Sequence, residues 1–151
     1  MTTVHRLEKR FTDNARNVMR AAEAESVFLQ HGFVGTEHVL LALVANDSIP
    51  QEFFRQKGVT VFSTRQQLER IRPSKVWPHG DWQPQSPGVK LLYDYALEES
   101  RNRNDEFVRT EHLILAICRS PECFAFRLLQ RLGVDPNSLG QEVNATIAAS
   151  E

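Results

Sequence analysis

The chain has few cysteines, no long apolar run and almost no net charge. Two cysteines, Cys118 and Cys123, in 151 residues are too few for a disulfide framework. No apolar run approaches the roughly 18 residues needed to cross a bilayer, and residues 1–10 lack the apolar stretch of a secretory signal. We therefore expect a cytoplasmic protein in a reducing compartment, with no membrane partner.

The charge balance and the missing motifs exclude further classes of function. The formal net charge is −1, so bulk electrostatics do not favour nucleic acid as a partner. No Gly-x-x-x-x-Gly-Lys-Ser/Thr phosphate loop occurs anywhere in the chain. No pairing of a nucleophile with a base stands out either. We expect no catalytic residue and no cofactor.

What the chain does have is an internal repeat. The segment 33–43, Phe-Val-Gly-Thr-Glu-His-Val-Leu-Leu-Ala-Leu, returns 74 positions later as Phe-Val-Arg-Thr-Glu-His-Leu-Ile-Leu-Ala-Ile at 107–117. A repeat sets the structural unit, which here is about 70 residues. Each half alone would bury little apolar surface, so we expect the halves to share a core.

The repeat divides the chain into two halves and a connection. Repeat 1 is expected at about 8–71 and repeat 2 at about 85–147, within one domain spanning 8–146. The intervening segment 72–84 contains three prolines and a glycine, which favours a linker over a helix. It also carries Trp77 and Trp82, which either pin the linker to its own domain, the use we favour, or serve as interface anchors.

The apolar residues follow a helical spacing throughout, so the predicted fold is all-α. Thr12 and Ser86 are expected to cap the first helix of each half, and Thr36 and Thr110 the central helices, whose nearly continuous apolar runs indicate burial. Third helices are expected from Pro50 and Pro121 to Gly58 and Gly133, and fourth helices roughly at 63–71 and 136–147. The prediction is two tandem four-helix repeats with pseudo-two-fold symmetry.

The histidines and cysteines invite a test for metal binding. His38 and His112 follow the glutamate in both halves, but a zinc site usually needs four converging ligands. Buried, hydrogen-bonded structural histidines are the favoured interpretation. Cys118 aligns with an apolar residue of the first half and is most simply a core residue. We expect no metal.

These motifs resemble a known family. Phe-Thr-x-x-Ala at 11–15, the doubled Thr-Glu-His segment and Leu-Gly-Val at 132–134 are similar to the Clp N-terminal repeat domain, most closely of the ClpC and ClpA type. The resemblance covers about 8–146 and implies a stand-alone homologue or an excised domain. Departures from the pattern are Arg109 for glycine, Ser86 for threonine, Gly88 for a basic residue and Lys57 for leucine.

The resemblance implies a function in protein binding. Members of this family dock adaptors and substrates of the Clp unfoldase, and the ClpC branch also recognises phosphorylated arginine. The matching positions are Thr12 with Glu37 in the first repeat and Ser86 with Glu111 in the second. A carboxylate can grip a guanidinium, and a phosphate can accept from a hydroxyl and from N–H groups at a helix start. Arg109 either neutralises Glu111 or attracts the phosphate.

Other interpretations of the same residues remain open. Thr followed by Glu at a helix start is also ordinary capping chemistry. A chain without an ATPase module could compete for adaptors or bind the assembled protease. Alternatively, it could be a stand-alone enzyme such as a phosphoarginine hydrolase acting through Glu37, or a small-ligand sensor, because fold does not imply function.

Overall fold

The structure is a computed structural model in which residues 8–71 and 85–150 are described. The predicted linker, with Trp77 and Trp82, lies outside these residues. The described part holds seven α-helices, two short 3₁₀ helices and no strand, so the all-α prediction is confirmed. Its elements are η1 (Glu8–Arg10), α2 (Asp13–Phe28), α3 (Thr36–Ala45), η2 (Arg55–Lys57), α4 (Val61–Ile71), α5 (Pro87–Asn102), α6 (Thr110–Cys118), α7 (Phe124–Arg131) and α8 (Pro136–Ser150).

The third element differs between the halves. The prediction of a third helix in each half is therefore wrong for the first half. After Pro50 the chain makes turns and the single 3₁₀ turn η2, while after Pro121 a full helix, α7, begins at Phe124. The α7 start receives a cap from the other repeat, since the Ala125 N–H donates to the Thr36 hydroxyl at 3.0 Å. Both elements end at a glycine with positive φ, as expected.

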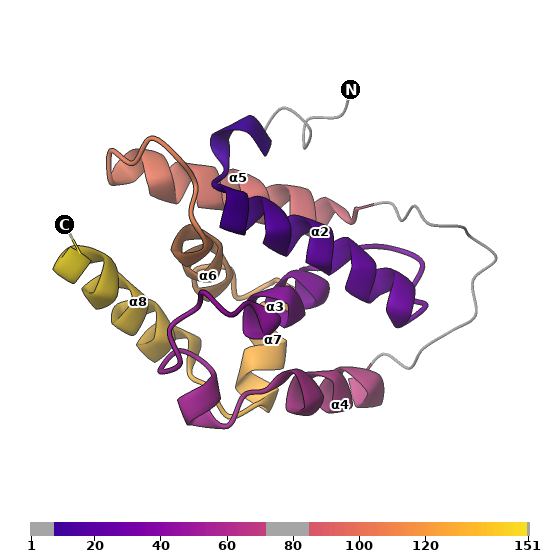
Figure 1. Ribbon diagram of the computed structural model, residues 1–151. Helices are drawn as coiled ribbons and strands as arrows, with labels where there is room; N and C mark the ends of the chain where they lie inside the picture. Colours follow the sequence, from indigo (N-terminus) through magenta and orange to yellow (C-terminus); the bar gives the residue numbers. More distant parts are fainter. Residues whose placement is uncertain (1–7, 72–84, 151) are drawn as a thin grey trace.

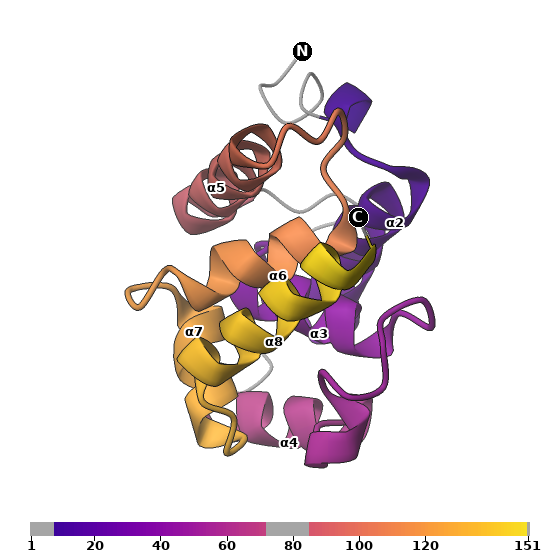
Figure 2. The ribbon, with the colours of Figure 1, turned by 90° about the vertical axis from the view of Figure 1, so that its left-hand side faces the viewer.

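The central helices are α3 and α6, as their apolar runs predicted. Nearly every residue of both is buried, including Leu41 and Leu115. Figures 1 and 2 show α2 and α5 on one side of this pair and α4, α7 and α8 on the other. Helix α3 contacts α2, α4, α5, α6 and α7, so it touches elements of both repeats.

The two halves form one body rather than two. A single core cluster contains buried side chains from both repeats. Phe11 and Tyr93 meet edge to face with ring centroids 5.8 Å apart. On the surface, the Lys57 ammonium lies 2.7 Å from a Glu142 oxygen, so the departure from leucine at 57 makes an ion pair between repeats. The shared core predicted from the size of each repeat is therefore present.

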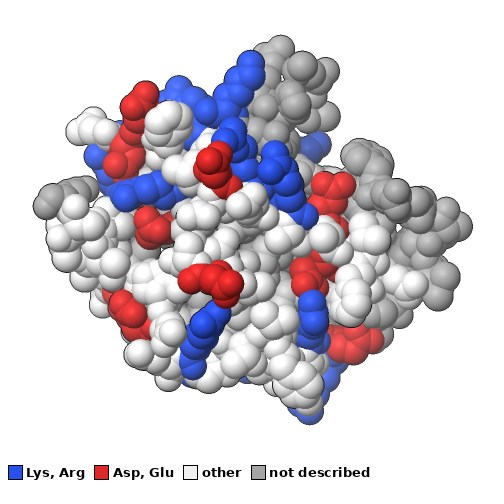
Figure 3. Space-filling view, in the orientation of Figure 1, with Lys and Arg blue, Asp and Glu red and all other residues white. Residues whose placement is uncertain are grey.

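The surface carries both charge signs without a large field of either. In Figure 3, basic and acidic side chains alternate across the face seen in Figure 1. No helix among residues 8–71 and 85–150 combines the length and the apolar character that crossing a bilayer requires.

Candidate functional site

The cap residue of the first helix in each repeat pairs with the opposite repeat. The Thr12 N–H donates to the Val108 carbonyl at 2.9 Å, and the Ser86 N–H donates to the Val34 carbonyl at 2.8 Å. These contacts belong to two isolated parallel bridges that cross between the repeats. Two composite sites result, each with the start of a first helix beside the start of the other repeat's central helix.

The predicted caps at Thr12 and Ser86 are confirmed. The Thr12 hydroxyl accepts from the Ala15 N–H at 3.2 Å, and the Ser86 hydroxyl accepts from the Val89 N–H at the same distance. Pro87 takes the first helical position of α5, as expected. Each hydroxyl therefore satisfies one helical N–H, while other N–H groups of the first turn have no partner within the helix.

The pairing of cap and glutamate within one repeat is wrong. Thr12 stands at the start of α2, whereas Glu37 stands beyond its end, next to a histidine that contacts His31. A 16-residue helix is about 24 Å long, so α2 keeps the two apart. Helix α5 separates Ser86 from Glu111 in the same way. The structure instead associates Ser86 with the Glu37 segment, and Thr12 with the Glu111 segment.

We call these the first site (the starts of α3 and α5, with Glu37 and Ser86) and the second site (the starts of α6 and α2, with Glu111 and Thr12). In the first site, a Cβ built on Gly88 would lie 3.7 Å from the Thr36 methyl group, so the two helix starts nearly touch. Two helix N-termini converge at each site, and the positive ends of both helix dipoles favour negative charge there.

The caps of the central helices are one residue earlier than predicted. Gly35 and Arg109 hold the cap positions, and Thr36 and Thr110 are the first helical residues. The capping group comes from the histidine: the Gly35 N–H donates to Nδ1 of His38 at 2.8 Å. Arg109 and His112 repeat this contact at the same distance. The histidines are therefore buried and hydrogen-bonded, as favoured from the sequence.

Glu37 occupies space that only a glycine at position 35 leaves free. A Cβ on Gly35 would lie 2.0 Å from Oε1 of Glu37, far inside van der Waals contact. The backbone at Gly35 is extended, with φ −110°, so glycine is required here by space and not by conformation. The carboxylate is folded back over the helix start, and Glu37 is only 1% exposed.

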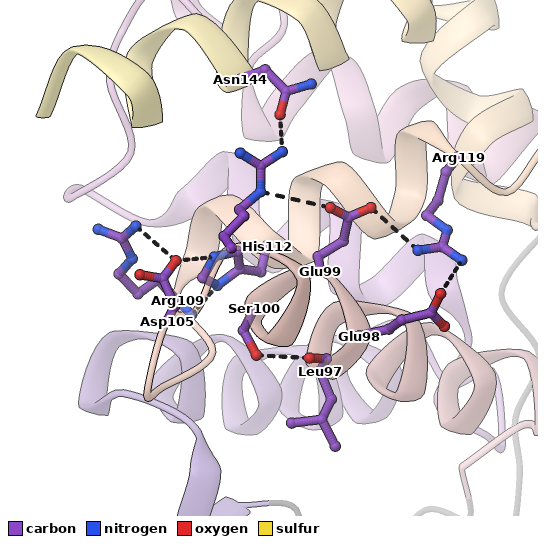
Figure 4. Close-up of polar contacts among 10 residues, drawn as sticks. Leu97, Glu98, Glu99, Ser100, Asp105, Arg109, His112, Arg119 and Asn144 are labelled. Atoms are coloured by element: carbon purple, nitrogen blue, oxygen red, sulfur yellow. Dashed lines mark hydrogen bonds and ion pairs between the residues drawn. The ribbon is translucent and has the colours of Figure 1, made fainter. Parts of the chain in front are cut away.

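The second site is built differently because Arg109 replaces the glycine. Its guanidinium Nη2 lies 3.2 Å from Oδ2 of Asp105, and its Nε lies 3.7 Å from Oε2 of Glu111. The other Glu111 oxygen accepts from the Thr110 hydroxyl at 2.8 Å. Figure 4 shows Arg109 and His112 both directed at Asp105. Glu111 is displaced outward, with 23% of its side chain exposed.

The histidine partners also differ. Because Nδ1 of His38 accepts, its proton is on Nε2, which donates to Nδ1 of His31 at 2.8 Å. In the second repeat, Nε2 of His112 donates to Oδ2 of Asp105 at 2.9 Å. Burial lowers the pKa of His112 below its usual value, although the Asp105 carboxylate acts in the opposite direction. His112 is therefore neutral at pH 7.

Cys118 lies in the core, whereas the Cys123 thiol lies beside the first site, where it contacts the Thr36 side chain. Burial raises the pKa of the Cys118 thiol to about 12, and burial also raises the pKa of Cys123. Both are free thiols, and Cys118 belongs to the core, as predicted. Within the described ranges, no group of three or more histidine, cysteine and acidic side chains is placed to hold a metal ion.

Two grooves at corresponding places in the repeats have diverged. The groove between α2 and α4 is apolar, and its phenylalanines Phe28 and Phe62 are 67% and 74% exposed. The corresponding groove between α5, α6 and α8 is lined by Glu99, Arg119 and Asn144, which Figure 4 shows in a polar network. The first groove therefore offers an apolar contact surface that the second lacks. The sequence carried no signal that Phe28 and Phe62 would share one groove.

The family is settled by comparison with known proteins. The model of the Clp repeat (R) N-terminal domain matches residues 10–132 and 94–151. The chain belongs to this family, as the repeat motifs indicated. It is thus a module of the kind found in Clp chaperones.

The relatives are much longer proteins. The chain is 31% identical over 148 residues to the chloroplastic chaperone protein ClpC1 of Oryza sativa subsp. japonica, covering 97% of this chain and 16% of that protein. It is also 31% identical over 139 residues to a probable ATP-dependent Clp protease ATP-binding subunit of Chlamydia pneumoniae, covering 89% of this chain and 16% of that protein. The chain therefore spans about a sixth of the length of these relatives.

Solved structures agree on the fold. The N-terminal domain of the chaperone ClpD from Arabidopsis thaliana superposes with a TM-score of 0.79 at 25% identity, covering 93% of this chain and 96% of that one. The Hsp104 N-terminal domain from Candida albicans gives a TM-score of 0.72 at 15% identity, with 88% of each chain covered. The second similarity concerns the fold alone.

Proposed function

We propose that this chain is a non-catalytic protein-binding module of the Clp system that docks adaptors or clients, including proteins marked by phosphoarginine. The observation that carries the proposal is the crossed pairing of the repeats. It joins a buried carboxylate, Glu37, to the start of α5 at Ser86, so one place offers both halves of the required chemistry.

The chemistry fits a ligand with two differently charged ends. The phosphoryl group would accept from N–H groups at the converging starts of α3 and α5 and from the Ser86 hydroxyl. The guanidinium would pair with the Glu37 carboxylate through charge-assisted hydrogen bonds. Gly88, in the first turn of α5, adds no side chain that would cover this helix start.

Binding at the first site requires Glu37 to move. With 1% of the residue exposed and the carboxylate held over Gly35, a ligand can reach it only after the side chain turns outward. The first site is therefore in a closed arrangement in this structure, and part of the interaction energy of a ligand opens it. We expect modest affinity for isolated phosphoarginine and higher affinity for a partner that adds a second contact.

The apolar groove at Phe28 and Phe62 supplies such a second contact. Exposed aromatic side chains are common anchors in protein interfaces. Arg65 stacks over the Phe28 ring with its guanidinium carbon 4.8 Å from the centroid, which holds that ring in place. We infer that adaptors or clients of the unfoldase use this groove.

A reducing cytosolic compartment remains our expectation for this chain, whereas the rice relative is named as chloroplastic.

Calorimetric titration of a phosphoarginine peptide into the protein tests the pocket. Glu37→Ala should weaken binding roughly ten- to a hundredfold, since a charge-assisted hydrogen bond contributes about 1.5–3 kcal/mol. Glu111→Ala should have a smaller effect. Glu106→Ala, an exposed carboxylate outside either site, is the matched control. The same peptide with unmodified arginine should bind weakly.

Two outcomes would change the proposal. Undetectable binding by the wild type would remove the phosphoarginine pocket and leave protein docking alone. Release of inorganic phosphate from the peptide over hours would instead establish a hydrolase, the alternative function considered from the sequence.

A further inference from the structure

The two composite sites differ at a pair of corresponding positions that contact each other. Position 35 is glycine and position 109 is arginine; position 31 is histidine and position 105 is aspartate. In the second repeat the two exchanged residues form an ion pair of 3.2 Å. The second repeat therefore has both the arginine and the carboxylate that holds it in place. An isolated surface substitution would lack such a partner.

The Arg109 guanidinium stands where an arginine-like ligand would be held. The Nη2 atom of this guanidinium faces Asp105. Its Nε atom lies 3.7 Å from the carboxylate of Glu111, the residue that corresponds to Glu37. The remaining Glu111 oxygen is bonded to the Thr110 hydroxyl. Both oxygens of Glu111 are thus engaged by the protein's own side chains. The arginine is always protonated, so the contact persists at any physiological pH.

We infer that Arg109 is a built-in occupant of the second site, which therefore excludes guanidinium ligands and leaves the domain with one phosphoarginine site instead of two. This inference rests on the proposed function and refines it. A second guanidinium at Glu111 would have to displace Arg109 or stand beside it, and like charges at such distances repel. Arg109 is a specificity-determining residue and takes no part in holding the ligand.

The number of ligands bound by each variant tests the inference. Phosphoarginine peptide is titrated into the wild type and into Arg109→Gly, which restores the residue found at position 35. The wild type should bind one equivalent and Arg109→Gly two, the added site disappearing again in Arg109→Gly/Glu111→Ala. Arg109→Gln, uncharged and compatible with the extended backbone, repeats the test if the glycine variant fails to fold.

The reverse exchange closes the first site. His31→Asp/Gly35→Arg transfers the ion pair into the first repeat and should reduce the stoichiometry from one to zero. Circular dichroism and a thermal unfolding curve check that this variant is folded. Arg131→Ala, an exposed cation at the C-terminal end of α7, serves as the control for a charge change outside both sites.

The outcomes separate this inference from the proposed function. One equivalent for both the wild type and the Arg109 variants, or two for the wild type, would overturn the inference and leave the proposed function standing. No binding by the wild type but one equivalent by Arg109→Gly would support the inference and refute the first site. No binding by either protein would overturn both.

Discussion

Gly35→Ala should destabilise the protein, although the backbone there accepts any residue. The new Cβ would lie 2.0 Å from Oε1, 2.6 Å from Cδ and 2.9 Å from Oε2 of Glu37. The methyl group and the carboxylate cannot share this space, and the carboxylate is the part that can move. Alanine at position 35 therefore expels Glu37 from its buried place.

The magnitude follows from two opposing effects. Forcing a methyl group into space that Glu37 fills costs about 1–3 kcal/mol, because the side chain and its neighbours must shift. Replacing glycine by alanine at a permitted backbone conformation restricts the unfolded chain and returns about 0.4–1 kcal/mol. The net loss is about 1–2 kcal/mol. For a domain of this size it lowers the melting temperature by about 2–8 °C.

Thermal unfolding of four proteins measures this effect: wild type, Gly35→Ala, Glu37→Ala and the double variant. In the Glu37→Ala background the alanine at 35 meets no carboxylate, so it should be neutral or slightly stabilising. Gly88→Ala is the matched control, because its Cβ would meet only ordinary contacts at 3.7 Å and alanine favours the helix. Equal costs of Gly35→Ala in both backgrounds would refute the steric explanation.

Three further predictions concern the core and the titrating groups. Leu41→Ala removes a fully buried side chain and should cost about 2–5 kcal/mol in denaturant unfolding, whereas Phe62→Ala should cost little. The pKa of His112 is lowered in the fold, so acidification below its unfolded value should destabilise the wild type more than His112→Asn when melting temperatures at pH 7.5 and 5 are compared. Cys118, with its pKa of about 12, should resist iodoacetamide at pH 8 until the protein unfolds.

The sequence determined the features that depend on neighbouring residues. Thr12 and Ser86 cap their helices through contacts three residues away, so local chemistry was enough to identify them. Leu41 and Leu115 are buried because their helices are apolar on nearly every face. The repeat indicated a shared core, since neither half could bury enough surface by itself.

Local patterns failed where a partner from the other repeat decides the conformation. Pro50 and Pro121 predicted equal third helices, yet only α7 is a full helix, and its start is capped by Thr36 from the first repeat. The sequence also placed the caps of α3 and α6 one residue late. No threonine hydroxyl caps these helices; a histidine ring at the third helical position instead accepts from the N–H of the cap residue, an arrangement with a weaker sequence signature.

The composition of the two sites was decided by the tertiary structure. The match of each repeat to the family pattern associated Thr12 with Glu37, but a rigid 16-residue helix stands between them. The two-fold arrangement instead joins each cap to the glutamate segment of the opposite repeat. The difference between Glu37 and Glu111 likewise arises in three dimensions, since a side chain at position 35 or 109 competes with the carboxylate for one volume. The sequence lists the residue at position 35 or 109 and the glutamate two positions later, but only the packing shows that their side chains cannot occupy the same volume.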